Sequence, residues 1–138
     1  MAPTFKHGRS ALFKMSDSAA ATINYSSGLT DCSLSRQLDP AEVTTFGDSD
    51  KVYIPGLRGA TISCSGIWSS THAKKLDASL GHSTLLTWTY WPESTATGSL
   101  YFTGSGILTS VDVGAPVGDK VSMNFNVQVS GAITRSTE

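Results

Sequence analysis

The sequence is short of charge, and of glutamate in particular. Only 15% of its 138 residues are charged, and they include just three Glu and six Lys, whereas about a quarter of the residues are charged in an average globular domain. The formal net charge is −1, so no electrostatic attraction would hold the chain tightly to nucleic acid or to an anionic membrane. This balance disfavours dedicated DNA binding as the main activity.

Long apolar runs and numerous cysteines are also missing. No segment approaches the roughly 20 apolar residues that span a bilayer, and residues 1–10 lack the apolar stretch of a secretory signal. We therefore expect no membrane binding by this chain. Cys32 and Cys64 are too few for a disulfide scaffold. Because both lie in strand-like segments, we expect buried free thiols in a reducing compartment.

Patterns that carry chemistry are absent as well. The three histidines have no second ligand at metal-binding spacing, and no Gly-x-Ser-x-Gly motif occurs. Gly104-Ser105-Gly106 is only a fragment of a phosphate-binding loop. Asp48 and Asp50 lie together at an expected turn, where Asp is a common turn former, and a calcium or acid site there is the weaker interpretation. We predict no catalytic residues, no metal and no cofactor.

Hydroxyl side chains are what the sequence has in abundance. It contains 21 Ser and 16 Thr. Short uncharged polar side chains suit sheet faces and turns better than helix surfaces, where Glu and Lys are expected. The length fits one ordinary domain. We therefore expect a single, mostly β domain over residues 1–138, with flexible arms at 1–8 and 134–138.

Seven runs of β-like residues predict strands, at 10–15, 21–25, 29–38, 60–68, 84–91, 99–113 and 121–130. The run 84–91 is apolar on both faces, as in strands buried on both sides, and Gly104 and Gly106 predict a bulge or bend in 99–113. Apolar and polar residues alternate most cleanly in 121–130. In the last run, Asn124, Asn126 and Gln128 lie on the polar face. Pro40 lacks the amide that a ladder needs, so we expect the third run to end before it.

One helix is expected, over about residues 72–80. Thr71 suits its N-cap, Leu76 and Leu80 share a face, and Gly81 suits the residue that ends it. About seven or eight strands with this short helix predict an all-β fold, either a β-sandwich or a partly closed barrel.

The segment 41–59 differs from the runs on either side of it. It has too many turn residues for one strand, yet it carries apolar side chains that a free loop does not need. We expect a long excursion like a β-hairpin, turning near residues 47–50. A loop this long is more often functional than idle.

The tryptophans leave a second interpretation open. Trp68, Trp88 and Trp91, with neighbouring Tyr and Phe residues, could form a platform for stacking sugars, as in a carbohydrate-binding module. They fall within strand patterns rather than on exposed loops. The core or a subunit interface is therefore the favoured place for them.

Three short motifs stand close together within residues 32–68. They are Thr-Thr-Phe-Gly-Asp at 44–48, Pro-Gly-Leu at 55–57 and Ser-Gly-Ile-Trp at 65–68. Together they resemble a signature of the tail tube (major tail) proteins of long-tailed bacteriophages. Where that family often carries Lys-Asp after Gly-Leu, this chain has Arg58-Gly59.

The resemblance implies a structural virion protein without catalytic activity. It implies six copies closing into a ring, rings stacking into the tail tube, and DNA passing through the lumen after a tape-measure protein leaves. The implied partners are other copies of the chain, the tape-measure protein, the tail terminator and the tail-tip proteins. The implied location is the virion tail, after assembly in the host cytoplasm. A tail terminator, baseplate ring or capsid decoration protein of the same particle is the alternative.

On this reading the 41–59 segment is the adhesive part of the chain. The expected contacts with other subunits and rings are Val43, Thr44, Thr45, Phe46, Gly47, Asp48, Lys51, Tyr53, Ile54, Pro55, Gly56 and Leu57. A mobile segment that orders on contact would delay polymerisation until a nucleating end is present. The face with Asn124, Asn126 and Gln128 is the candidate lumen wall, because DNA slides past uncharged groups.

Overall fold

The computed structural model describes residues 8–16, 22–26, 28–80, 85–93 and 95–137. In this part of the chain, seven strands, one α-helix and a short 3₁₀ segment confirm the predicted all-β class. In order they are η1 (Gly8–Ser10), β1 (Leu12–Ser16), β2 (Thr22–Asn24), β3 (Leu29–Glu42), β4 (Tyr53–Ile67), α1 (Ser70–Ser79), β5 (Leu86–Trp91), β6 (Leu100–Gly114) and β7 (Ser122–Thr137).

The seven strands form one antiparallel sheet in the order β2-β1-β5-β6-β7-β4-β3. In the described residues no ladder joins β2 to β3, so the sheet does not close into a barrel. It folds over on itself instead. The rings of Phe13 on β1 and Phe125 on β7 lie 5.9 Å apart, although β5 and β6 separate these strands in the sheet. The two halves therefore face each other as the layers of a sandwich do.

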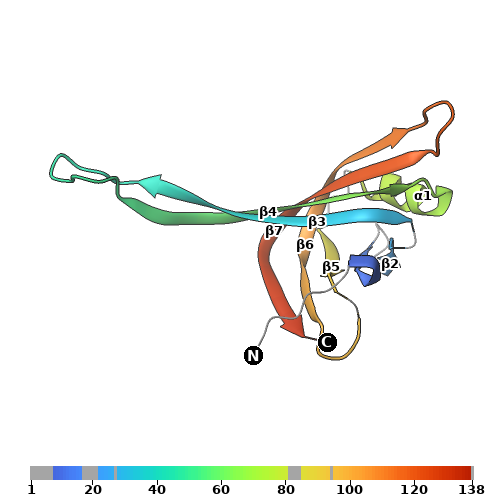
Figure 1. Cartoon of the computed structure of the whole chain (residues 1–138), viewed down its shortest axis with the longest axis horizontal. Helices are drawn as coiled ribbons and strands as arrows, with labels where there is room; N and C mark the ends of the chain where they lie inside the picture. The colour runs from blue at the N-terminus through green and yellow to red at the C-terminus, as the bar shows by residue number, and fades with distance from the viewer. Residues whose placement is uncertain (1–7, 17–21, 27, 81–84, 94, 138) are drawn as a thin grey trace.

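The fold-over happens within β6 and β7, which belong to both halves. They pair from Leu100↔Thr137 to Gly114↔Ser122, with a register shift between Thr103 and Ser105 that leaves extra residues in β7. Among these extra residues is Gly131, whose φ of +85° lies in the region that favours glycine. A bulge of this kind bends a strand and increases its twist, and Figure 1 shows both strands curving between the halves. The register shift lies at Gly104, where the sequence predicts a bulge or bend, although the extra residues belong to β7.

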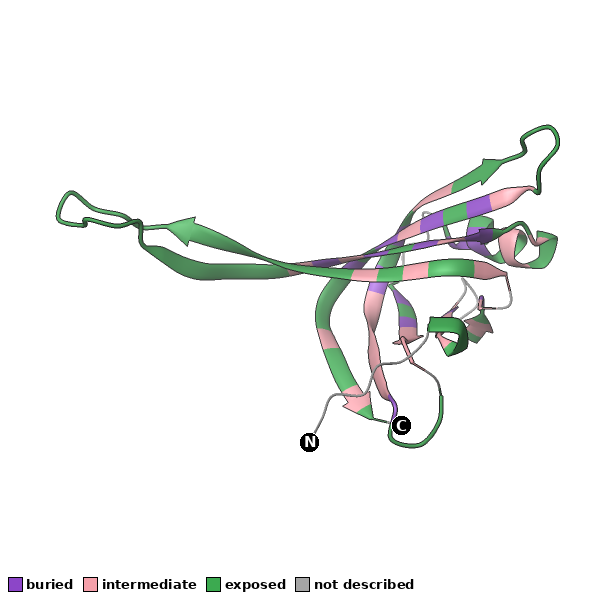
Figure 2. Cartoon of the chain, viewed as in Figure 1, coloured by how far each residue is buried: buried purple, intermediate pink, exposed green. Residues whose placement is uncertain are grey.

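The core lies between the two halves. Its largest fully buried side chains include Trp88, Phe13, Phe125 and Ile62. On β7, buried residues alternate with more exposed ones, as the 121–130 pattern predicts. Leu76 of α1 is fully buried, and the helix packs against β6. Figure 2 shows the buried residues gathered around the middle of the fold, with one long ribbon exposed throughout.

The helix starts earlier than expected. Ser69 occupies the N-cap in an extended conformation and accepts the first helical hydrogen bond, from Ala73 N at 2.8 Å. Thr71, the expected N-cap, therefore lies inside the helix. The extended chain continues up to Trp68, whose N still donates to Val121 O at the end of β4. Gly81, the expected stop, lies outside the described residues. The described helices include none that is long and apolar enough to cross a membrane.

Strand β3 extends further than expected. β3 continues through Pro40 to Glu42, with a register shift between Leu38 and Pro40. Pro40 is tolerated because β3 is an edge strand, where a missing amide on the unpaired side breaks no ladder bond.

The chain ends also differ from the expected flexible arms. Residues 134–137 form the last part of β7 and pair with residues 100–103 of β6. The prediction of a loose segment there is wrong, because β6 extends far enough to supply a partner. At the other end Gly8 begins η1, and residues 1–7 lie outside the described part of the chain.

Candidate assembly interface

The outer ends of β3 and β4 leave the body of the protein as a paired ribbon. The ladder continues from Leu38↔Arg58 to Glu42↔Tyr53. The predicted hairpin is confirmed, although much of the expected 41–59 loop is strand. We call residues 38–58 the arm. Every residue from Ser35 to Arg58 is exposed, and Figure 1 shows the ribbon projecting away from the rest of the molecule. The arm therefore buries none of its side chains in its own core.

The tip of the arm is a turn closed by its own hydrogen bonds. Val43 N donates to Val52 O at 2.8 Å, and Asp48 N donates to Thr45 O at 3.0 Å. Thr45 N in turn donates to Asp48 Oδ2 at 2.8 Å. Phe46 stands at the apex, fully exposed. Asp48 is thus a turn former, and the described residues contain no cluster of metal-ligating side chains. This geometry favours a preformed arm over one that orders only on contact.

The Pro-Gly-Leu motif shapes the arm behind its tip. Pro55 lies opposite Pro40, next to the register shift in β3. At Gly56 a Cβ atom would overlap the carbonyl oxygen of Asp39, so only glycine lets the two strands approach this closely. The following Leu57 is 87% exposed. The motif therefore combines a close approach of the two paired strands with an exposed apolar side chain.

Apolar side chains occupy both faces of the arm. Tyr53 and Ile54 are each about half exposed, and successive residues of a strand point to opposite faces. Unburied apolar surface of this extent typically marks a contact with another protein. The structure brings together on the arm all the residues predicted for the interface, namely Val43, Thr44, Thr45, Phe46, Gly47, Asp48, Lys51, Tyr53, Ile54, Pro55, Gly56 and Leu57.

The amide side chains of β7 lie on a polar face that covers neighbouring strands. Ser63 Oγ on β4 donates to Asn126 Oδ1, and Asn126 Nδ2 donates to Ser110 Oγ on β6 at 2.8 Å. Gln128 Nε2 donates to Ala60 O at 3.0 Å. Asn124 lies opposite Ser65. These contacts link β4, β7 and β6 through uncharged groups, and the three predicted residues share this face.

Among the described residues, the half of the sheet that carries this face has two edges without a partner strand. One is β3, which pairs with β4 alone. The other is the outer part of β6, because the described residues of β5 pair with β6 from Phe102 to Gly106 and those toward Gly114 have a described partner only in β7. Unpaired edges invite pairing with another chain unless something covers them. This half can therefore be extended by neighbours on both sides.

The tryptophans do not support a sugar platform. Trp88 is fully buried, which confirms the core interpretation. The ring of Trp91 lies 5.7 Å from that of Tyr101, and Lys14 Nζ lies 5.3 Å from the Trp91 ring centre. With Trp88 inside the core, the three tryptophans cannot share one exposed surface.

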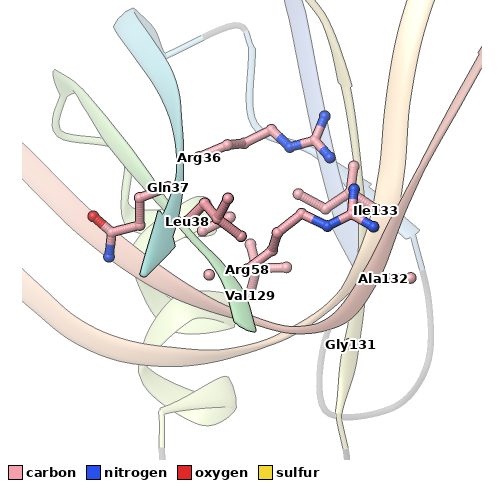
Figure 3. A pocket seen from close by; sticks show the side chains of 10 residues that line it. Arg36, Gln37, Leu38, Arg58, Val129, Gly131, Ala132 and Ile133 are labelled. Carbon is pink, nitrogen blue, oxygen red and sulfur yellow. The ribbon is translucent and has the colours of Figure 1, made fainter. Parts of the chain in front are cut away.

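A groove at the base of the arm was missed by the sequence analysis. It has a volume of about 680 Å³ and is lined by Arg36, Gln37, Leu38, Arg58, Gly59, Ala60, Val129, Gly131, Ala132 and Ile133 (Figure 3). We call it the basal groove. Arg36 lies on the otherwise apolar face of the 29–38 run, and this exception was the signal that could have predicted it.

The structure is similar to solved components of tails and injection systems. A chain from the tail of an empty gene transfer agent particle has a TM-score of 0.75 at 16% identity, over 96% of this chain and 99% of that one. A chain of the SPP1 tail tube has a TM-score of 0.76 at 11% identity, over 96% and 80%. A chain of the anti-feeding prophage baseplate has a TM-score of 0.74 at 10% identity, over 99% and 97%. At these identities the likeness establishes the fold.

No curated protein sequence matches this chain. The family model described as "Phage tail tube protein" matches residues 6–135, which is almost the whole chain. Together with the fold and the projecting arm, this match shows that the chain belongs to the phage tail tube protein family.

Proposed function

We propose that six copies of this structural protein close into a ring, and that the rings stack through their arms into a tube through which DNA leaves the particle. Membership of the tail tube family establishes a structural role in the tail. The sixfold ring is supported by the C6 symmetry of the similar gene transfer agent tail. The single observation that carries the stacking is the arm, which is exposed along its whole length and apolar on both faces.

Ring closure is supported by the two unpaired edges. The free edge of β3 and the outer part of β6 lie at opposite sides of the same half of the sheet. Because these edges differ, pairing between copies is head-to-tail, and repeated head-to-tail contacts close into a ring when the rotation fits. The few charges on these strands leave the edges open to such pairing.

The polar face is the proposed lumen wall. Asn124, Asn126 and Gln128 present uncharged groups. Among the described residues that lie in register with them on neighbouring strands, the only carboxylates are Asp31 and Asp112, both at the level of Asn124. A wall without arginine or lysine would form no lasting contacts with phosphate, so DNA would slide past it. We propose that the tape-measure protein fills this lumen before DNA does.

The remaining partners are proposed for the two ends of the tube. Similar chains occur in a structure of the anti-feeding prophage baseplate and in one of its tube-terminating cap. This supports contacts of our protein with a tail-tip complex at one end and a tail terminator at the other. We propose that assembly takes place in the host cytoplasm, that the finished tube resides in the virion tail, and that the chain acts as one domain without catalytic activity.

The test is assembly by the purified protein. Electron microscopy, with and without tail-tip proteins as nucleators, should reveal long hollow tubes. A variant with residues 43–52 replaced by Asn-Gly should keep its circular dichroism spectrum and remain as monomers or single rings in sedimentation. Normal tubes from this variant would refute the stacking role of the arm.

A second candidate is a ring protein at one end of the same tail. The similarity to the baseplate and cap chains favours it. The same micrographs separate the two functions, because a terminal ring protein stops at isolated rings whereas a tube protein keeps adding them.

A further inference from the structure

We propose that the basal groove of one copy receives the arm tip of a copy in the next ring. This inference rests on the proposed stacking function, and it names the surface on which the tip docks. The groove is cationic and partly apolar, whereas the tip is acidic and carries an exposed phenyl ring.

Two arginines give the groove its charge. Arg36 lies opposite Ala60, and Arg58 lies opposite Leu38. Both arginines are therefore on the same face of the β3–β4 ribbon. Nearer the body, this face carries the buried Ile62. Figure 3 shows both guanidinium groups extending in the same direction, toward β7 at the far side of the groove. Neither is paired with a carboxylate in the part of the chain that the structure describes, and no acid lines the groove. Two neighbouring cations without a counterion attract an anionic partner.

Apolar side chains form most of the rest of the groove lining. Leu38 comes from the arm, while Val129 and Ile133 come from β7 on either side of its bend. Val129 is buried and Ile133 is half-buried. This surface suits an aromatic side chain flanked by carboxylates, because the ring covers apolar atoms while the carboxylates meet the guanidinium groups.

The arm tip has this complementary chemistry. Residues 42–52 contain Glu42, Asp48, Asp50 and Lys51, which gives a net charge of −2. All four residues are exposed, and Phe46 projects from the apex between them. An exposed aromatic side chain flanked by carboxylates is a typical docking element for a cationic, partly apolar groove.

The tip and the groove lie at opposite ends of the same arm. From Leu38 to Phe46 is eight residues, or about 26 Å at about 3.3 Å per residue. A neighbour displaced by this distance along the arm therefore places its groove at the tip of the first copy. Because the two surfaces differ, the contact repeats without closing on itself and produces an open-ended stack.

DNA phosphate is the other anion that two arginines can bind. The groove, however, lies on the opposite face of β3 and β4 from the polar face. Ser63 is on the polar face, opposite Asn126, and Ser35 is on the same side of the sheet. Arg36 follows Ser35 in the strand and therefore points to the other side. A tube lined by the polar face would keep the arginines away from the DNA. The second copy is therefore the better occupant.

A charge swap tests the docking. Asp50 is chosen because Asp48 holds the turn. Asp50→Arg and Arg58→Asp each place like charges together, so each should raise the lowest protein concentration that supports tube elongation about tenfold or more. The double variant restores opposite charges at every junction and should return this concentration to within about twofold of the wild type. Lys74→Asp, on the exposed face of α1, makes the same change of charge elsewhere and should leave elongation unchanged.

The outcomes separate the two proposals. Wild-type tubes together with normal elongation of Arg58→Asp overturn the groove and leave the proposed function standing. Two defective single variants without rescue in the double variant overturn the pairing of tip and groove. Normal tubes that release DNA differently in Arg58→Asp identify nucleic acid as the occupant and also overturn it. If the wild type forms no tubes under any nucleating condition, the proposed function fails and the groove assignment fails with it.

Discussion

Cys32 on β3 and Cys64 on β4 lie directly opposite each other, and one thiol donates a hydrogen bond to the other. The carbonyl oxygen of Cys32 also accepts a hydrogen bond from Tyr90 Oη across the core, at 3.0 Å. This small cluster joins the two halves of the folded-over sheet. Both cysteines are free, as the sequence predicts.

The thiol pair makes the fold sensitive to alkaline pH. The hydrogen bond with Cys32, followed by burial, raises the pKa of the Cys64 thiol far above its ordinary value of 9.0. The folded state therefore keeps a proton that the unfolded state loses above about pH 9. The stabilisation is complete below this pH and declines above it, by at most about 1.4 kcal/mol per pH unit for this thiol. Burial raises the pKa of Tyr90 too, in the same direction.

Denaturant unfolding under reducing conditions, at about pH 8 and about pH 10, measures this effect. The wild type should lose stability between the two values. Cys64→Ala should lose less, even though the cavity that it creates lowers its stability at both. An equal pH dependence in the two proteins would contradict the assignment.

Changing Phe46 to Asp should stop elongation while the fold stays intact. The side chain is fully exposed at the apex of the arm, so the substitution alters no contact within the core. It removes the apolar anchor proposed for the ring-to-ring contact. Sedimentation velocity and circular dichroism read out assembly and folding separately. Phe46→Tyr keeps the ring and should still form tubes, and tubes of normal length from Phe46→Asp would count against the arm.

Changing Gly66 to Ala should destabilise the fold. A Cβ at this position in β4 would overlap the carbonyl oxygen of Gly28, which is backbone and cannot move aside cheaply. We expect a loss of about 1–3 kcal/mol in the free energy of unfolding. Gly59→Ala in the same strand is the matched control, because its Cβ would meet nothing closer than Gln37 at 3.9 Å. Thermal unfolding of the two variants gives the comparison, and equal melting temperatures would contradict the crowding at Gly66.

Changing Gln128 to Lys should slow DNA release from phage particles that carry the substitution. A lysine on the proposed lumen wall would contact passing phosphates, and raising the salt concentration should weaken the effect. Gln128→Glu also loses the hydrogen bond from Gln128 Nε2 to Ala60 O, so it controls for that loss. The release rate after receptor addition is the measurement. Equal rates in the two variants would place this residue outside the lumen.

Local rules were sufficient for much of the fold and for the place of the arm. The alternation in 121–130 determined which side chains of β7 face the core, because the period of a strand depends only on adjacent residues. The same holds for the turn at Phe46, where Thr45 and Asp48 bond to each other over three residues. Composition was enough to predict a mostly β protein, and the capping residues and the spacing of Leu76 and Leu80 were enough to predict its single short helix.

Only the tertiary structure decided the features that depend on partners distant in the sequence. β3 runs through Pro40 because it lies at an edge, and residues 134–137 form a strand because β6 extends alongside them. The contact of Cys32 with Cys64 follows from strand register. The basal groove, which Arg36, Arg58 and Ile133 line together, follows from register and from the bend of β7. Strand order and bending arise from packing over the whole chain, and no local pattern encodes them.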